Sequence, residues 1–327
     1  MRLLVPLVVA MLSQEGSSKP QVVEPEKTFR GHEGDVHDVT FSPRGDVLAT
    51  AGFDKTVRIW SVEKGTELAT FGGHTGKVLS VAFSQDGTRL VSCGADKTVK
   101  LWKVPAASPE TPSGAEERKP IEAERTITGH TELVHAAIFS NDGKVVASAG
   151  TDKTIRIWNP DDGTQILSIA AHASSVYSLV YSPDGSLLVS GGLDTQVKVW
   201  EGATGKAVKT LEGHTEGVNN LAFEADGQTL FSCSFDRTVR KWNVADGTQI
   251  ASYDHPGWVF GLVLNPSDKE LISLDYGGNL LHWSLDGGEI IHHRKIASIS
   301  YELAQSPDKR WLASAHQGDV FLIERAP

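Results

Sequence analysis

The 327-residue chain has only two cysteines, Cys93 and Cys233, and no Cys/His spacing typical of a zinc site. Two cysteines cannot form the disulfide framework that stabilises small secreted domains. Cationic residues are also few, because 31 Lys and Arg stand against 41 Asp and Glu, for a formal net charge of −10. Nucleic-acid modules usually carry an excess of positive charge for phosphate contacts. We therefore expect no nucleic-acid partner.

No membrane span is expected either, because the apolar run at residues 3–12 is too short to cross a bilayer as a helix. This run follows Arg2 and precedes a polar segment at 13–19. A basic start, a short apolar core and small residues nearby are typical of a secretory signal peptide. The pattern predicts a signal peptide over residues 1–18 and an exported protein, periplasmic or extracellular. The alternative is a disordered apolar tail on a cytoplasmic protein.

Tryptophan and glycine, in contrast, are abundant, with 8 and 32 residues. Six tryptophans recur at intervals of 42, 56, 42, 42 and 41 residues, namely Trp60, Trp102, Trp158, Trp200, Trp242 and Trp283. The long interval contains an insertion at residues 104–123 that is rich in Pro, Ala, Ser and Glu. This composition cannot bury a core, so the insertion is predicted to be a solvated loop. Without it, the repeat is regular.

Each period repeats one local pattern. A Gly-His pair or a near variant opens it, as at 31–32, and an apolar alternation typical of a half-buried strand follows, as at 36–41. A turn comes next, as at 42–45, where Pro presets φ and Gly accepts positive φ. Two further strands and a weaker fourth complete the unit. Four short antiparallel strands per period of about 42 residues predict one blade of a propeller.

On these Gly-His…Trp units, the chain after residue 25 resembles the WD-repeat (G-beta-like) family. Five copies are well formed, and a sixth and seventh are degenerate. The resemblance implies an all-β fold, a single seven-bladed β-propeller of four-stranded antiparallel blades over residues 22–327. Residues 26–30 are expected to supply the fourth strand of blade seven. Closing the ring in this way removes exposed sheet edges, which otherwise invite aggregation.

A His, Ser or Thr, Asp and Trp set also recurs. In the family, these positions imply a buried chain of hydrogen bonds from Trp to hydroxyl, hydroxyl to imidazole and imidazole to carboxylate. The set matches a hydrolase triad in composition, but a catalytic site would occur once, so five copies indicate a structural role. The predicted members are His32, Thr50, Asp54 and Trp60; His74, Ser92, Asp96 and Trp102; His130, Ser148, Asp152 and Trp158; His172, Ser190, Asp194 and Trp200; and His214, Ser232, Asp236 and Trp242.

The last two blades are predicted to lack the full set. Blade six has Gly277 where Asp is expected. Blade seven has Ala313, Gln317 and Ile323 at the Ser, Asp and Trp positions. These blades are therefore expected to be held mainly by packing and by closure of the ring, since terminal repeats are often atypical.

Two classes of function fit such a fold, and fold alone does not decide between them. The first is a non-catalytic, monomeric scaffold that needs no cofactor or metal and binds a protein or peptide of unknown identity through its loop face. The alternative is an exported metal-assisted hydrolase or lactonase with its site in the central channel. That site needs several carboxylate, Asn or His side chains directed inward from the first strands. Those strands are mostly apolar and small, as at 78–83, so we expect the scaffold.

The binding surface is predicted from an asymmetry between repeats. In the family, partners commonly contact three positions per blade on the face that carries the Gly-His loops. At these positions blades five, six, seven and one have six aromatic residues among twelve, whereas blades two to four have one large aromatic. Clustered, partly buried aromatics are typical of interaction sites; the competing interpretation is that they only plug the channel mouth. The predicted partner-binding residues are Trp258, Phe260, Phe235, Tyr276, Tyr301, Phe53, His37 and Asp35, with Trp258 central.

Overall fold

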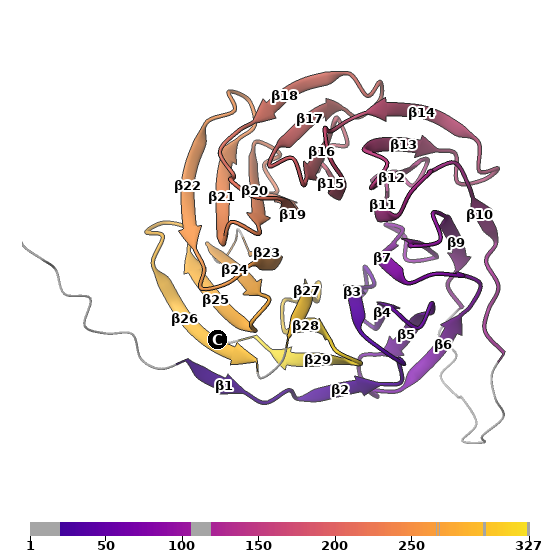
Figure 1. Ribbon diagram of the computed structural model, residues 1–327. Helices are drawn as coiled ribbons and strands as arrows, with labels where there is room; N and C mark the ends of the chain where they lie inside the picture. Colours follow the sequence, from indigo (N-terminus) through magenta and orange to yellow (C-terminus); the bar gives the residue numbers. More distant parts are fainter. Residues whose placement is uncertain (1–19, 106–118, 266, 268, 297–298, 326–327) are drawn as a thin grey trace, which may run out of the picture.

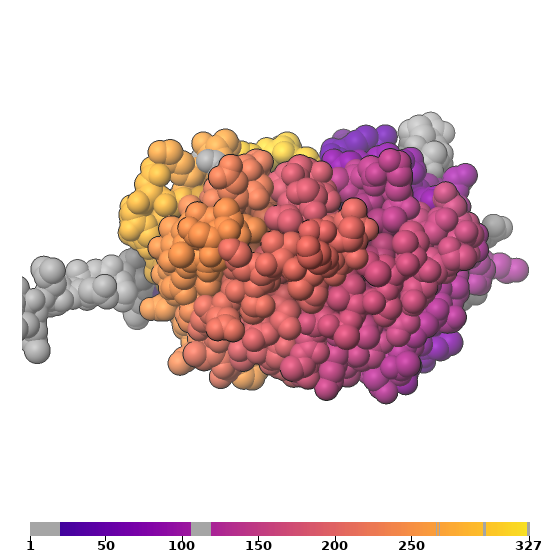
Figure 2. Space-filling model, turned by 90° about the horizontal axis from the view of Figure 1, so that it is seen from above, coloured from indigo at the N-terminus to yellow at the C-terminus, as the bar shows by residue number. Residues whose placement is uncertain are grey.

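The computed structural model describes residues 20–105, 119–265, 267, 269–296 and 299–325. These residues form seven small sheets arranged in a ring around a central channel (Figure 1). The predicted all-β, seven-bladed propeller is confirmed. Seen from the side, the molecule is a thick disc whose near rim belongs to blades three to five (Figure 2). The signal peptide predicted over 1–18 lies outside the described residues.

Blades one to five follow the predicted order, in which the chain starts beside the channel and moves outward strand by strand. Blade one has β3 (Val36–Phe41), β4 (Val47–Gly52), β5 (Val57–Ser61) and β6 (Glu67–Phe71). Blade two has β7 (Val78–Phe83), β8 (Arg89–Gly94), β9 (Val99–Lys103) and β10 (Arg125–Ile127). Blade three has β11 (Val134–Phe139), β12 (Val146–Gly150), β13 (Thr154–Trp158) and β14 (Gln165–Ala170). Blade four has β15 (Val176–Tyr181), β16 (Leu187–Gly192), β17 (Val197–Glu201) and β18 (Ala207–Leu211). Blade five has β19 (Val218–Phe223), β20 (Thr229–Ser234), β21 (Thr238–Asn243) and β22 (Gln249–Asp254).

The last two blades share the N-terminal segment. Blade six has β23 (Val259–Asn265), β24 (Glu270–Asp275), β25 (Asn279–Ser284) and β26 (Ile290–Ile296). Blade seven has β27 (Ser300–Gln305), β28 (Trp311–His316), β29 (Asp319–Glu324) and β2 (Lys27–Arg30). β2 pairs antiparallel with β29, which is the closure that the sequence predicts. A further strand, β1 (Gln21–Val23), runs parallel along β26 as a fifth strand of blade six and was not predicted.

The apolar core lies between neighbouring blades rather than at the centre of the ring. One of its clusters joins Phe29 and Leu322 of blade seven to Val39, Leu48 and Trp60 of blade one. The second strand β4 is buried at every position because blades cover both of its faces, whereas the outer β14 has only exposed and half-buried residues. Each blade thus depends on its neighbours for burial of apolar surface.

The described end of the insertion differs from the predicted solvated loop over 104–123. Ile121 lies parallel to the rim strand β6, where its N–H donates to the carbonyl of Thr70 (2.8 Å) and its carbonyl accepts from the N–H of Gly72 (3.0 Å). Ile121 and Ala123 pack against the cluster between blades one and two. These two apolar residues attach the end of the segment to the propeller. The overall polar composition of the segment did not predict this contact.

Candidate binding site at the channel mouth

The repeated His-containing sets are hydrogen-bonded networks inside the blades. In blade one, Trp60 Nε1 donates to Thr50 Oγ1 (2.9 Å), which lies 2.7 Å from His32 Nε2, and His32 Nδ1 lies 3.0 Å from both carboxylate oxygens of Asp54. Because a carboxylate only accepts, His32 Nδ1 carries the proton and the Thr50 hydroxyl donates to Nε2. The equivalent bonds of blades two to five measure 2.7–2.9 Å.

These networks have the composition of a hydrolase triad but not its accessibility. Thr50, whose hydroxyl group is at the centre of the network, is 0% exposed, and so are the four equivalent serines. Burial alone would raise the pKa of the Asp54 carboxyl, but the hydrogen bond and charge of His32 hold that pKa below its ordinary value. Every polar group of the network is therefore satisfied internally, and its hydroxyl cannot reach a substrate.

Blade six, predicted to lack the full set, keeps the Trp, hydroxyl and imidazole part of the network. His255 Nε2 lies 2.6 Å from Ser273 Oγ, and Trp283 Nε1 donates to the same hydroxyl (2.7 Å). A carboxylate is also nearby, because Asp275 Oδ2 lies 3.7 Å from His255 Nδ1, a distance too long for a hydrogen bond. It comes from the end of β24 rather than from the turn at Gly277. The repeat pattern places the aspartate in the turn, so it does not indicate Asp275.

Blade seven also differs from the prediction. The pairing of Leu303 with Ser314 places Ser314, not Ala313, at the hydroxyl position of this blade. His316 Nε2 lies 2.7 Å from Ser314 Oγ, and its Nδ1 lies 2.8 Å from the carbonyl oxygen of Ile299. The imidazole thus comes from a strand instead of a loop, and Ile323 replaces the tryptophan. Burial lowers the pKa of His316 to about 4, so the ring is neutral near pH 7.

The predicted partner-binding aromatics form a connected group. The ring of Phe235 lies 5.8 Å from that of Trp258 and 5.6 Å from that of Phe260, and both contacts are edge-to-face. Tyr276 lies 5.9 Å from Trp258 and 5.7 Å from Phe260. The Tyr276 N–H also donates to the Trp258 carbonyl (2.8 Å), which fixes the backbone beneath the indole. Trp258 is 50% exposed, whereas the other three are half-buried.

The group continues across blades seven and one through the remaining predicted residues. Tyr301 lies 6.0 Å from Tyr276, and its hydroxyl donates to Asp35 Oδ2 (2.9 Å). Burial and the Asp35 carboxylate raise the pKa of Tyr301 to about 12. The His37 ring stacks between Tyr301 at 6.0 Å and Phe53 at 5.7 Å. The structure therefore brings together all eight residues of the predicted set.

Three residues that the sequence comparison left out extend this group. Tyr177 of blade four lies 6.1 Å from Phe235, and His135 of blade three lies 4.7 Å from Tyr177. On the other side, Lys77 Nζ lies 3.9 Å from the centroid of the Phe53 ring. These side chains were not predicted because blades two to four have few aromatic residues at the contact positions. We call the connected rings the aromatic collar: His37, Phe53, His135, Tyr177, Phe235, Trp258, Phe260, Tyr276 and Tyr301.

β-Bulges in the first strands explain how the collar forms. In β3 the register shifts between Val36 and Asp38, which leaves His37 unpaired. The same shift occurs in the first strand of every other blade. A bulge redirects the extra side chain, and His135, Tyr177, Phe260 and Tyr301 all occupy the bulged position.

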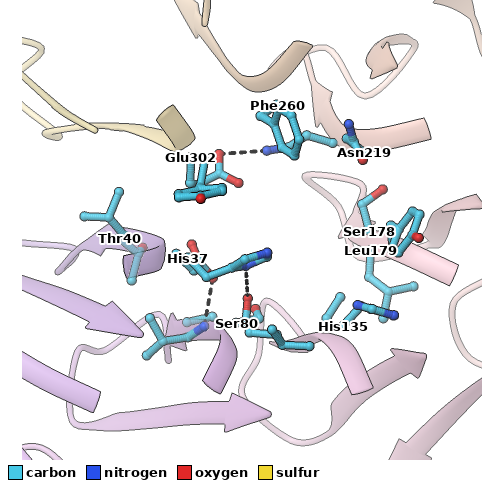
Figure 3. A pocket seen from close by; sticks show the side chains of 18 of the residues that line it. His37, Thr40, Ser80, His135, Ser178, Leu179, Asn219, Phe260 and Glu302 are labelled. Carbon is cyan, nitrogen blue, oxygen red and sulfur yellow. Dashed lines mark hydrogen bonds between the residues drawn. The ribbon is translucent and has the colours of Figure 1, made fainter. Parts of the chain in front are cut away.

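The residue after each bulge faces the channel, where a cavity of about 650 Å³ lies below the collar (Figure 3). The expectation that inward positions are mostly apolar and small is wrong for this ring. Its members that line the cavity are Asp38, Ser80, Ala136, Ser178, Asn220 and Glu302. A strict two-residue alternation does not reveal them, because the bulge interrupts it. These residues share one position in the first strand of each blade, and this shared position could have identified them from the sequence.

Two carboxylates of this ring are half-buried and hydrogen-bonded. Asp38 Oδ2 accepts from the Val81 N–H (2.8 Å), and Glu302 Oε1 accepts from Asn220 Nδ2 (2.9 Å) and from the Leu303 N–H (2.9 Å). Burial raises the pKa of Asp38 to about 6. Burial, with the charge of Asp38, raises the pKa of Glu302 well above its ordinary value.

Comparison with known proteins gives the following matches. The family model "WD domain, G-beta repeat" matches residues 23–61, 65–103, 122–159, 163–201 and 205–243. A serine-threonine kinase receptor-associated protein from Gallus gallus is 28% identical over 143 residues, which cover 43% of this chain and 36% of that protein. A probable cytosolic iron-sulfur protein assembly protein CIAO1 homolog from Chlamydomonas reinhardtii is 50% identical over 42 residues, 13% of this chain and 12% of that protein. Ribosome biogenesis protein ERB1 from Chaetomium globosum is 44% identical over 50 residues, 15% of this chain and 6% of that protein. The matched part spans little more than a third of these relatives at most.

Proposed function

The chain belongs to the WD-repeat family, and from this premise we propose that it is a monomeric, non-catalytic scaffold that binds a protein or peptide at the aromatic collar. The observation that carries the proposal is Trp258, which is 50% exposed although rings contact it on two sides. Rigid aromatic side chains with exposed faces bury much area on binding at little cost in conformational entropy. An exposed cluster of this kind is typical of an interaction site.

Closure of the channel mouth alone does not explain this cluster. Seven collar rings line the cavity, but Trp258 and Tyr276 are not among its lining residues. Their position beside the mouth leaves the indole face open to solvent. This arrangement favours a contact with a partner over simple plugging of the channel.

Truncation of the collar is expected to weaken partner binding. With a partner obtained by pull-down from the native organism, we expect Trp258→Ala and Phe235→Ala each to weaken binding by at least about 1 kcal/mol, because central aromatics carry much of the interface energy. Binding is measured by calorimetry, and folding by thermal melting. Ile166→Ala is the matched control, since Ile166 is 58% exposed on the rim strand β14, away from the collar. Unchanged binding by both collar variants, or their unfolding, would assign the rings to packing.

The proposal that the chain is not an enzyme rests on two observations. The repeated hydroxyl groups are buried at 0% exposure, so a substrate cannot reach them. Within the described ranges, no group of three or more His, Cys, Asp or Glu is arranged to hold a metal ion. Elemental analysis distinguishes the alternative, because stoichiometric metal in the purified protein would favour a metal-assisted hydrolase.

We also propose that residues 1–18 direct export, on the sequence pattern alone. The structure contains no helix within its described residues that is long and apolar enough to cross a membrane. A fusion of residues 1–25 to a reporter that works only outside the cytoplasm is expected to be active. Mass spectrometry of the native protein is expected to show loss of at least residues 1–10. An intact N-terminus on cytoplasmic protein would support the cytoplasmic alternative instead.

A further inference from the structure

The channel holds two carboxyl groups, Asp38 and Glu302, that have no cationic partner among the described residues. No ion pair in the described part of the chain joins Asp38 or Glu302 to a Lys, Arg or His side chain. Their hydrogen bonds come from uncharged donors, namely two backbone N–H groups and the Asn220 amide. Buried carboxylates are normally paired or bound to a cation, because their desolvation is costly.

The aromatic collar at the mouth of the cavity can also attract a cation that enters toward the two carboxylates. The faces of aromatic rings carry negative potential and attract ammonium and guanidinium groups. The chain shows this attraction at the mouth itself, where Lys77 Nζ lies 3.9 Å from the Phe53 ring centroid. Phe235, Phe260 and Tyr301 also line the cavity, and no Lys or Arg of the described residues lies over their rings.

Other ligand chemistries fit these groups less well. An anion would approach two carboxylates, and an apolar side chain would leave both of them without a cationic partner. A metal ion that is held by protein groups usually requires more than two ligands. A single organic cation pairs with the carboxylates and contacts the rings.

We propose that the channel receives one cationic side chain, a lysine or arginine of the partner protein, which passes the aromatic collar and pairs with Asp38 and Glu302. This inference rests on the proposed scaffold function and specifies the chemistry of its ligand. A long side chain with a charged end and an apolar stem matches a site with rings above and carboxylates below.

The proposal implies that binding strengthens as pH rises. A cation favours the charged carboxylates, and the pKa of Asp38, about 6 because of burial, lies between pH 5 and pH 8. The other titratable groups around the pair are His37, His135, Lys77, Tyr301, Cys93 and Cys233. Burial lowers the pKa of His135 to about 4 and raises that of Tyr301 to about 12 and that of both thiols well above its ordinary value, so these four groups are neutral across that range. Burial also lowers the pKa of His37, and a charge on this ring at low pH acts in the same direction, because it repels a cation. Deprotonation of the carboxylates therefore controls the pH dependence.

The test compares three pentapeptides, acetyl-Gly-Gly-X-Gly-Gly-amide, in which X is lysine, arginine or the uncharged norleucine. Binding to the full chain is measured by saturation-transfer NMR at pH 8 and pH 5. At pH 8 we expect the lysine or arginine peptide to bind about tenfold more tightly than the norleucine peptide, because cation–π contacts and charge pairing strengthen binding by about this factor. We expect this preference to shrink at pH 5.

Matched variants locate the effect. Asp38→Asn/Glu302→Gln keeps side-chain shape and is expected to abolish the preference for a cation. Glu33→Gln/Glu216→Gln removes the same charge from two exposed residues beside the Gly-His loops and is expected to retain it. The amide variant is expected to melt at or above the wild-type temperature at pH 8, because it no longer buries charge. If it fails to fold, Glu302→Gln alone serves.

Two results would overturn the proposal: equal binding of the norleucine peptide, or a cation preference that survives the amide substitutions. These results leave the scaffold function separately testable. A partner that depends on Trp258 but binds the amide variant normally would retain the scaffold and reject the cation site. A partner that is insensitive to Trp258 would reject the scaffold instead.

Discussion

Removal of residues 22–30 is expected to cause aggregation or to lower the melting temperature by at least about 5 °C. The deletion removes β2, whose Phe29 is 1% exposed and lies between blades seven and one. Loss of a buried Phe side chain alone costs about 3–5 kcal/mol, and the deletion also leaves β29 as an unpaired edge. Thermal melting followed by circular dichroism, with light scattering for aggregation, measures the effect.

Point variants separate packing from edge exposure. Phe29→Ala keeps the β2 backbone and is expected to lower stability without aggregation. Val22→Ala is the control, because Val22 is 60% exposed in β1, and its effect is expected to stay within about 0.5 kcal/mol. A truncated protein that melts like the full chain would show that β2 is dispensable for closure.

Substitution of one network hydroxyl is expected to have the second largest effect. Ser232→Ala removes the group that accepts from Trp242 Nε1 (2.8 Å) and lies 2.7 Å from His214 Nε2. Both nitrogens then remain buried without a partner, and each unsatisfied group costs about 1–3 kcal/mol. We expect a loss of about 2–4 kcal/mol, measured by urea unfolding.

An exposed serine provides the comparison for this measurement. Ser186 also makes hydroxyl hydrogen bonds, but to Asp184 in an exposed turn. Ser186→Ala is therefore expected to change the free energy of unfolding by less than about 0.5 kcal/mol. Similar small losses in both variants would mean that the networks contribute little stability.

The sequence predicted the fold well where local pattern and tertiary structure agree. Each repeat Trp follows its hydroxyl residue by ten positions, because both lie on neighbouring strands of one blade, as for Thr50 and Trp60. The predicted network positions of blades six and seven were wrong where a residue at a different position of the repeat supplies the expected side-chain group. Asp275 lies at the end of a strand, and His316 replaces a loop histidine from within β28. A comparison of equivalent positions cannot detect such replacements.

The candidate site was only partly predictable for a different reason. The collar residues were found because aromatic type and repeat position together identified them. The acidic pair was missed because the bulge before Asp38 and Glu302 breaks the alternation that assigns strand faces. Their proximity also depends on the contact between blades seven and one, whose first strands are about 260 residues apart in the chain.

The pairing of β2 with β29 has a consequence for biosynthesis. Phe29 contacts Val320 only after nearly the whole chain has been made. At a synthesis rate of about 5–20 residues per second, the first of these strands waits for roughly 15–60 s before the second emerges. The early blades can pack against one another as they appear, but the N-terminal strand stays unpaired throughout this time. The nascent protein must therefore keep an unpaired strand with its Phe29 side chain from mispairing until translation is almost complete.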